Sequence, residues 1–418
     1  MSSQNGSRHP HLAGRAAAFV LIGLIAAACS PAPVPSANSP RLVSATPSAS
    51  PTTTSSDLVT IAAPGELGQC CSVEWSPDGK RFLVSGDRYE LLDDGGRVLA
   101  RNSEPTPAYP DWNAYRAVWL DSTTYAVGFG ADTNASTGTV TIHRLDGSAV
   151  HLPGTYSLPS MVGSGHGALA VAPEAMLSDA APTSFAVWSN GSLSQSIDGY
   201  PLEWSPDGSK LLVATSSPQV GGPAGNPTWV SVGIASYPDL RRTSAAAGVA
   251  LYNTGFAAPD VSASFSPDGR SIAFDCGRRT ATTNDCVAGI IDVAMRGAQT
   301  FPDRLNVLSW LPNGRLLVGS TTGSLQEWDG SKLVPSNLPS GTLSVSPTGV
   351  AAIATRANGQ EMTRLEANGL PIVDLPAVMS IYWSPDGSHV LLVVDRSDAI
   401  PGVVSPYATP GLVLVGLS

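Results

Sequence analysis

Short apolar runs alternate with turn-forming residues along most of the chain, from about residue 57 to the end. Runs such as 81–84, 210–213 and 389–393 each follow a Pro-Asp-Gly corner, and a shorter apolar or β-branched stretch precedes that corner. Stretch, tight turn and stretch together predict a β-hairpin. Two further strand-like stretches usually come next, as at 325–328 and 332–334. The pattern therefore predicts units of four strands.

The corner itself is a repeated motif. Proline presets φ near −65°, aspartate can bond its own backbone two residues on, and glycine takes a positive φ without steric cost. An aromatic residue stands before most copies, and we expect it to wedge between neighbouring sheets, where its burial stabilises by a few kcal/mol. The copies are Glu74-Trp75-Ser76-Pro77-Asp78-Gly79, Glu203-Trp204-Ser205-Pro206-Asp207-Gly208, Ser264-Phe265-Ser266-Pro267-Asp268-Gly269, Ser309-Trp310-Leu311-Pro312-Asn313-Gly314 and Tyr382-Trp383-Ser384-Pro385-Asp386-Gly387.

The spacing of the copies predicts the architecture. Four strands every 40-odd residues is the period of a β-propeller blade. With degenerate copies at Trp119, near Val162 and at Val345, the blade starts fall near residues 75, 119, 162, 204, 265, 310, 345 and 383. An all-β propeller of eight four-stranded blades follows, with seven blades left open as an alternative. The last blade is one strand short, so we expect Asp57 to Ala62 to supply its outer strand and close the ring.

Ser-Pro-Asp-Gly repeats that follow an aromatic residue resemble those of the TolB-like (WD40-like) β-propeller family. The resemblance covers residues 57–418. It implies the propeller fold but no single function, because such propellers serve as interaction platforms, as sensor domains and as accessory domains of peptidases and lyases.

The N-terminal segment has a different composition. Residues 1–28 combine basic residues with an apolar run from Ala16 to Ala28, which suits a signal peptide and is too short to span a bilayer. The run ends at Cys29 and resembles the lipobox of bacterial lipoproteins, which implies a lipid-modified (palmitate-bearing) Cys29. Ordinary secretion or an uncleaved anchor is the alternative. Residues 29–56 are rich in Pro, Ser and Thr and predict a disordered tether.

Charge and localisation agree with each other. The formal net charge is −10, and no basic cluster of the kind that binds nucleic acid is present. We expect an exported protein, lipid-anchored to the outer face of a bacterial membrane and part of the cell envelope, with the propeller at residues 57–418 standing off the anionic surface.

Cysteines are expected to pair in an oxidising compartment. Cys276 and Cys286 would bridge the loop between two strands of one blade. The neighbours Cys70 and Cys71 would form a strained vicinal disulfide or remain two thiols, because adjacent Cα atoms lie closer than an unstrained disulfide allows.

Arginines concentrate in the loops of one rim of the predicted ring. In an acidic protein such a rim could bind a carboxylate, a phosphate or an acidic partner; solvated polar loops are the alternative interpretation. The motif aspartates are interpreted as turn-forming residues, and the scattered histidines predict no metal site. The candidate ligand-binding residues are Arg88, Tyr115, Arg116, Arg278, Arg279 and Arg396.

No catalytic motif stands out, so the leading hypothesis is a non-catalytic platform for a protein, peptide or glycan, acting as a monomer without a cofactor. A glycan lyase or hydrolase with a site at the channel mouth is one alternative. A sensory or assembly component of a cell-envelope complex is the other.

Overall fold

The computed structural model describes sixteen stretches of the chain, all within Thr53–Ser418, one of two compact units. Among these residues the structure contains no helix of the length and hydrophobicity required to span a bilayer. The described residues are 58–62, 72–86, 88–102, 115–130, 137–173, 184–217, 228–243, 250–253, 262–275, 288–294, 298–302, 305–320, 324–357, 360–376, 378–395 and 410–417.

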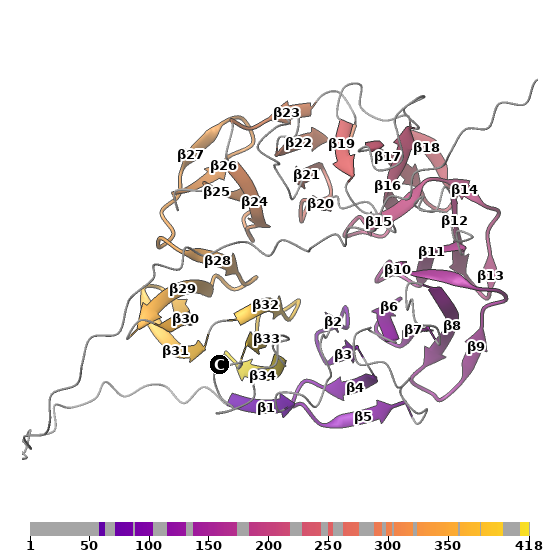
Figure 1. The fold of residues 1–418 in the computed structure, drawn as a ribbon, viewed down its shortest axis with the longest axis horizontal. Coiled ribbons are helices and arrows are strands. Elements are labelled where there is room, and N and C mark those ends of the chain that lie inside the picture. The colour runs from indigo at the N-terminus through magenta and orange to yellow at the C-terminus, as the bar shows by residue number, and fades with distance from the viewer. Residues whose placement is uncertain are drawn as a thin grey trace, which may run out of the picture. The chain divides into compact units, whose positions relative to one another are not determined.

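Strands make up all the regular elements of these stretches, and they form antiparallel sheets of a β-propeller (Figure 1). Sheet 72–101 contains β2 (Ser72–Trp75), β3 (Arg81–Ser85), β4 (Tyr89–Asp93) and β5 (Val98–Arg101). Sheet 200–253 contains β15 (Tyr200–Trp204), β16 (Lys210–Ser217), β17 (Thr228–Ser236), β18 (Arg241–Thr243) and β19 (Ala250–Asn253). Sheet 262–300 contains β20 (Ser262–Phe265), β21 (Ser271–Asp275), β22 (Gly289–Asp292) and β23 (Ala298–Thr300).

The later repeats follow the same order. Sheet 305–335 contains β24 (Leu305–Trp310), β25 (Leu316–Ser320), β26 (Leu325–Trp328) and β27 (Leu333–Pro335). Sheet 342–376 contains β28 (Thr342–Val345), β29 (Ala351–Ala357), β30 (Gln360–Ala367) and β31 (Leu370–Pro376).

The closing sheet joins the two ends of the propeller. It contains β32 (Val378–Trp383), β33 (His389–Asp395), β34 (Pro410–Gly416) and β1 (Leu58–Ala62), in the order β1-β34-β33-β32. Leu58 pairs with Val415 and Thr60 with Val413, and Figure 1 shows indigo β1 beside yellow β34. The predicted closure by an N-terminal outer strand is therefore confirmed.

The prediction of eight separate blades, or of seven, is wrong. Six sheets are single blades of four or five strands, whereas residues 115–198 form one nine-stranded sheet. That sheet contains β6 (Tyr115–Trp119), β7 (Thr124–Phe129), β8 (Thr137–Arg144), β9 (Ala149–His151), β10 (Tyr156–Gly163), β11 (Ala168–Pro173), β12 (Ser184–Ser189), β13 (Ser192–Leu193) and β14 (Ile197–Asp198).

Strand lengths explain why the two predicted blades merge. Strand β9 pairs only with residues 141–143 of β8, which leaves the first residues of β8 without a partner on that side. Strand β10 begins earlier than the sequence suggested, and its residues Tyr156 and Ser157 pair with Gly138 and Thr137. The open backbone groups of β8 are satisfied in this way.

The aromatic wedges connect neighbouring sheets as the sequence predicts. Each wedge tryptophan donates its indole N–H to the first strand of the preceding repeat, so that burial and hydrogen bonding act together. The bonds run from Trp75 to the Tyr382 carbonyl (3.0 Å), Trp119 to the Glu74 carbonyl (3.1 Å), Trp204 to the Val162 carbonyl (3.0 Å), Trp310 to the Ser264 carbonyl (3.3 Å) and Trp383 to Ser344 Oγ (2.9 Å).

Candidate functional site

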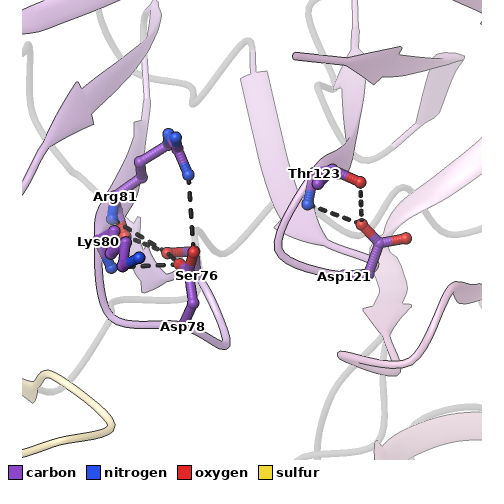
Figure 2. A network of polar contacts seen from close by, with 6 residues as sticks. All are labelled: Ser76, Asp78, Lys80, Arg81, Asp121 and Thr123. Atoms are coloured by element: carbon purple, nitrogen blue, oxygen red, sulfur yellow. Dashed lines mark hydrogen bonds and ion pairs between the residues drawn. The ribbon is translucent and has the colours of Figure 1, made fainter. Parts of the chain in front are cut away.

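The repeated Ser-Pro-Asp-Gly corners are structural. In the first corner, Ser76 Oγ donates to Asp78 Oδ1 at 2.7 Å and accepts the Arg81 amide at 3.0 Å, as Figure 2 shows. Gly79 has a φ of 68° and donates its amide to the Ser76 carbonyl at 2.9 Å. The neighbouring corner uses Asp121, which accepts both the amide and the hydroxyl of Thr123 (Figure 2).

Hydrogen bonds keep the corner aspartates ionised. The Ser384 hydroxyl and the Ser388 amide lower the pKa of Asp386 to about 2. The Ser205 hydroxyl, with the Ser209 amide, likewise lowers the pKa of Asp207. Because every donor comes from the same corner, these carboxylates stabilise turns, as the sequence indicated.

Two of the predicted rim residues are held by other groups of the protein. The Nε atom of Arg88 lies 3.3 Å from Oε1 of the buried Glu90, a carboxylate that also lies 3.9 Å from Arg101 Nε. Tyr115 is buried, with its ring 4.8 Å from that of Phe129. Arg88 Nε, like Arg116 Nε, is buried without a hydrogen-bond partner within the described stretches, but the ion pair with Glu90 engages Arg88 inside the protein.

Arg116 is the predicted residue that the structure places in a distinctive environment. It belongs to β6, and its guanidinium donates to the Met161 carbonyl of β10 at 3.4 Å. Its charge acts on Glu74 of β2 and on Tyr200 of β15. Strands β2, β6 and β15 are edge strands on the inner side of their sheets in Figure 1, whereas β10 lies between β8 and β11 within the nine-stranded sheet. Arg116 therefore lies where successive repeats converge.

The hydrogen-bonding capacity of Arg116 is only partly used. Its Nε atom is buried and has no hydrogen-bond partner within the described part of the chain. A guanidinium presents five N–H donors in a planar fork that matches carboxylates and phosphates. A buried donor without a partner costs about 1–3 kcal/mol, and because solvent does not reach this Nε atom, an anionic ligand would have to pair with other N–H groups of the partly exposed Arg116 side chain.

Glu74 and Glu203 each accept a hydrogen bond from the next repeat, a contact that we call the glutamate clasp and that the sequence did not predict. Glu74 Oε1 accepts the backbone amide of Trp119 at 3.1 Å, and Glu203 Oε2 accepts that of Phe265 at 2.8 Å. Burial raises the pKa of each carboxyl group to about 7, against the lowering effect of the accepted hydrogen bond. Each glutamate thus ties one repeat to the wedge of the next.

The remaining predicted residues lie outside the described stretches. These are Cys29, Cys70, Cys71, Cys276, Cys286, Arg278, Arg279 and Arg396. Within the described stretches, no group of three or more histidine, cysteine, aspartate or glutamate side chains could hold a metal ion.

A sequence signal for the glutamate clasp does exist. Two motif copies begin Glu-Trp-Ser-Pro-Asp-Gly, at Glu74 and Glu203, whereas other copies carry serine or tyrosine before the aromatic residue. A carboxylate on the innermost strand at the same motif position twice indicates a shared contact. The approach of Arg116 to Glu74 had no comparable signal, since it depends on how two neighbouring repeats are placed.

Comparisons with known proteins add little to this picture. No protein-family model matches the sequence, and no curated protein matches it. An oligogalacturonate lyase in complex with manganese is similar with a TM-score of 0.49 and 10% identity over 88% of this chain and 94% of that one. Porphyromonas gingivalis dipeptidyl peptidase 4 is similar with a TM-score of 0.47 and 10% identity over 81% of this chain and 59% of that one.

A third solved structure, a eukaryotic initiation factor, has a TM-score of 0.46 and 14% identity over 80% of this chain and 85% of that one. Similarity at this level gives no argument for an activity or a ligand. The assignment as a β-propeller rests on the strand order and pairing described above.

Proposed function

We propose that this chain is an exported, lipid-anchored β-propeller that binds a carboxylate- or phosphate-bearing segment of a protein, peptide or glycan at Arg116. The observation that carries the proposal is the partly exposed Arg116 side chain, which donates one hydrogen bond, to the Met161 carbonyl, within the described stretches and lies beside successive first strands. Anchoring through Cys29 is a proposal from the sequence alone.

Charge in this region supports an anionic ligand. Glu74 is the acid whose pKa responds to Arg116, and burial raises that pKa to about 7. About half of the Glu74 carboxyl groups are therefore protonated at neutral pH. Arg116 is incompletely neutralised by its own neighbours, and a ligand anion would complete the pairing.

An enzymatic function is less well supported. A carboxyl group with a pKa near 7 beside an arginine suits general acid–base chemistry. However, Glu203 has the same raised pKa and the same bond to the next wedge, although Arg116 is not among the groups that shift its pKa. A shared position and a shared contact favour a structural role for both glutamates.

Titration of the full-length protein in detergent tests the proposal. The probes are oligoglutamate and oligogalacturonate, with neutral oligoglutamine and oligogalactose as references, measured by isothermal calorimetry. We expect the acidic probes to bind and Arg116→Gln to weaken them about tenfold or more. Arg356→Gln is the matched control, because Arg356 is an exposed arginine paired with Glu361 at 3.3 Å.

Each result bears on a different claim. Equal weakening by the two substitutions would show a non-specific charge effect and would refute the site at Arg116. If the wild type cleaves a probe, and Glu74→Gln still binds that probe but no longer cleaves it, the protein is an enzyme and not a non-catalytic platform. An assembly role would appear as stoichiometric recovery of an envelope protein after mild crosslinking.

A further inference from the structure

A cavity whose lining does not include Arg116 lies between sheet 72–101 and the first part of the nine-stranded sheet. Its volume is about 430 Å³, and its lining comes from β3, β4 and β5 on one side and from β7, β8 and the turn after β8 on the other. Small-molecule sites commonly measure about 300–1,000 Å³ and combine an apolar lining with a few polar groups. The volume falls in this range; the lining is mixed polar and apolar, and the crevice is open to solvent on one side.

Aromatic rings form one wall of this cavity. The rings of Tyr125 and His143 stack with centroids 5.2 Å apart and an interplanar angle of 14°, and the Tyr89 ring lies 6.1 Å from His143. Burial lowers the pKa of His143, so this imidazole is mainly neutral at pH 7. The wall is therefore uncharged, but its rings are not coplanar, because those of Tyr89 and His143 are tilted by 43°. Leu99 and Leu145, 42% and 36% exposed, add apolar surface at its edge.

The charged residues of the lining are both arginines. Arg144 is exposed, and its guanidinium donates a 3.4 Å hydrogen bond to Ser148 Oγ. Arg81 lies 3.7 Å from Asp78. No carboxylate belongs to the described lining, although Asp146 in the adjacent turn is near enough for Arg144 to lower its pKa. The polar end of the cavity therefore favours an anion.

We propose that this crevice binds a small planar aromatic molecule that carries an anionic group. The ring would stack against one aromatic ring of this wall, and the anionic group would pair with Arg144. Offset stacking of aromatic rings stabilises beyond simple area burial, and a guanidinium forms charge-assisted hydrogen bonds with a carboxylate.

Indole-3-acetate tests the proposal, with neutral indole-3-acetamide as its matched partner. Binding to the full-length protein is measured by ligand-observed NMR and calorimetry. We expect the acid to bind about tenfold more tightly than the amide. In Arg144→Gln this preference should disappear while the amide binds as before. In Ala100→Phe, which fills the crevice, neither compound should bind.

Controls separate this site from the proposed one and from general charge. Arg97→Gln removes an exposed arginine of the same sheet that lies 3.0 Å from Asp93 and outside the lining, and it should leave both affinities unchanged. Arg116→Gln should also leave the affinities for indole-3-acetate and indole-3-acetamide unchanged. The proposal is overturned if indole-3-acetate does not bind, if Arg144→Gln keeps the preference for the acid, or if Arg116→Gln abolishes it. Binding of glucuronate without binding of indole-3-acetate would overturn the assignment of a planar ring.

Discussion

Replacing both clasp glutamates by glutamine should change how stability depends on pH. In Glu74→Gln/Glu203→Gln, the amide oxygens can still accept the backbone N–H groups of the next wedges, at the positions now 3.1 and 2.8 Å away. The variant differs mainly in having no group to ionise. The comparison therefore isolates the free-energy cost of the two buried charges.

The magnitude follows from the raised pKa values. A shift from 4.5 to about 7 corresponds to about 3 kcal/mol per group. Both residues keep part of their surface accessible to solvent, so we expect about 2 kcal/mol each. Because the folded-state pKa is raised, this contribution to stability is fully present below pH 4.5 and is lost as the pH rises through 7.

Thermal unfolding followed by circular dichroism between pH 5 and 8 measures the effect. The double variant and the wild type should have similar Tm values at pH 5, and the variant should exceed the wild type by roughly 5 °C or more at pH 8. Glu361→Gln, at an exposed glutamate, should follow the wild type throughout. A Tm difference that stays constant with pH, or that grows as the pH falls, would refute the burial of these carboxyl groups.

Other substitutions test the packing of the first strands and the corners. An added Cβ at Gly163 would lie 1.8 Å from the Trp119 carbonyl oxygen, whereas one at Gly95 would meet nothing closer than 3.5 Å. Gly163→Ala should therefore lower the urea midpoint of unfolding markedly, and Gly95→Ala should leave it unchanged. Equal midpoints for the two variants would contradict the close approach at Gly163. Ser205→Ala removes the 2.6 Å hydrogen bond to Asp207 and should cost about 1–3 kcal/mol. That hydrogen bond lowers the pKa of Asp207, so the stability that it contributes is lost as the pH falls and Asp207 becomes protonated. The destabilisation caused by Ser205→Ala should therefore shrink in acid. A destabilisation that stays constant down to pH 2 would argue against this role of the hydrogen bond.

Local chemistry explains what the sequence could predict. The corners depend on residues adjacent in the chain, and Gly79, Gly208 and Gly387 all take φ values between 67° and 70°. The wedges depend on one aromatic residue in most of the repeats. The closing strand follows from a missing partner in the last sheet, and the pairing of β1 with β34 confirms it.

Tertiary placement explains what the sequence could not predict. The fusion of two blades depends on which residues of β8 the short strand β9 leaves open, and no local pattern encodes that register. The environment of Arg116 depends on neighbouring first strands that approach one another. Likewise, Tyr125 and His143 stack because β7 and β8 pair with these residues in register.

Recovery of a partner from the native membrane tests the central claim most directly. The full-length wild type, Arg116→Gln and Arg356→Gln proteins would be produced at equal levels, crosslinked in intact cells and isolated, and the bound material quantified by mass spectrometry. The proposal predicts an acidic partner or glycan with the wild type and with Arg356→Gln, and its loss with Arg116→Gln. Equal recovery with all three proteins would contradict it.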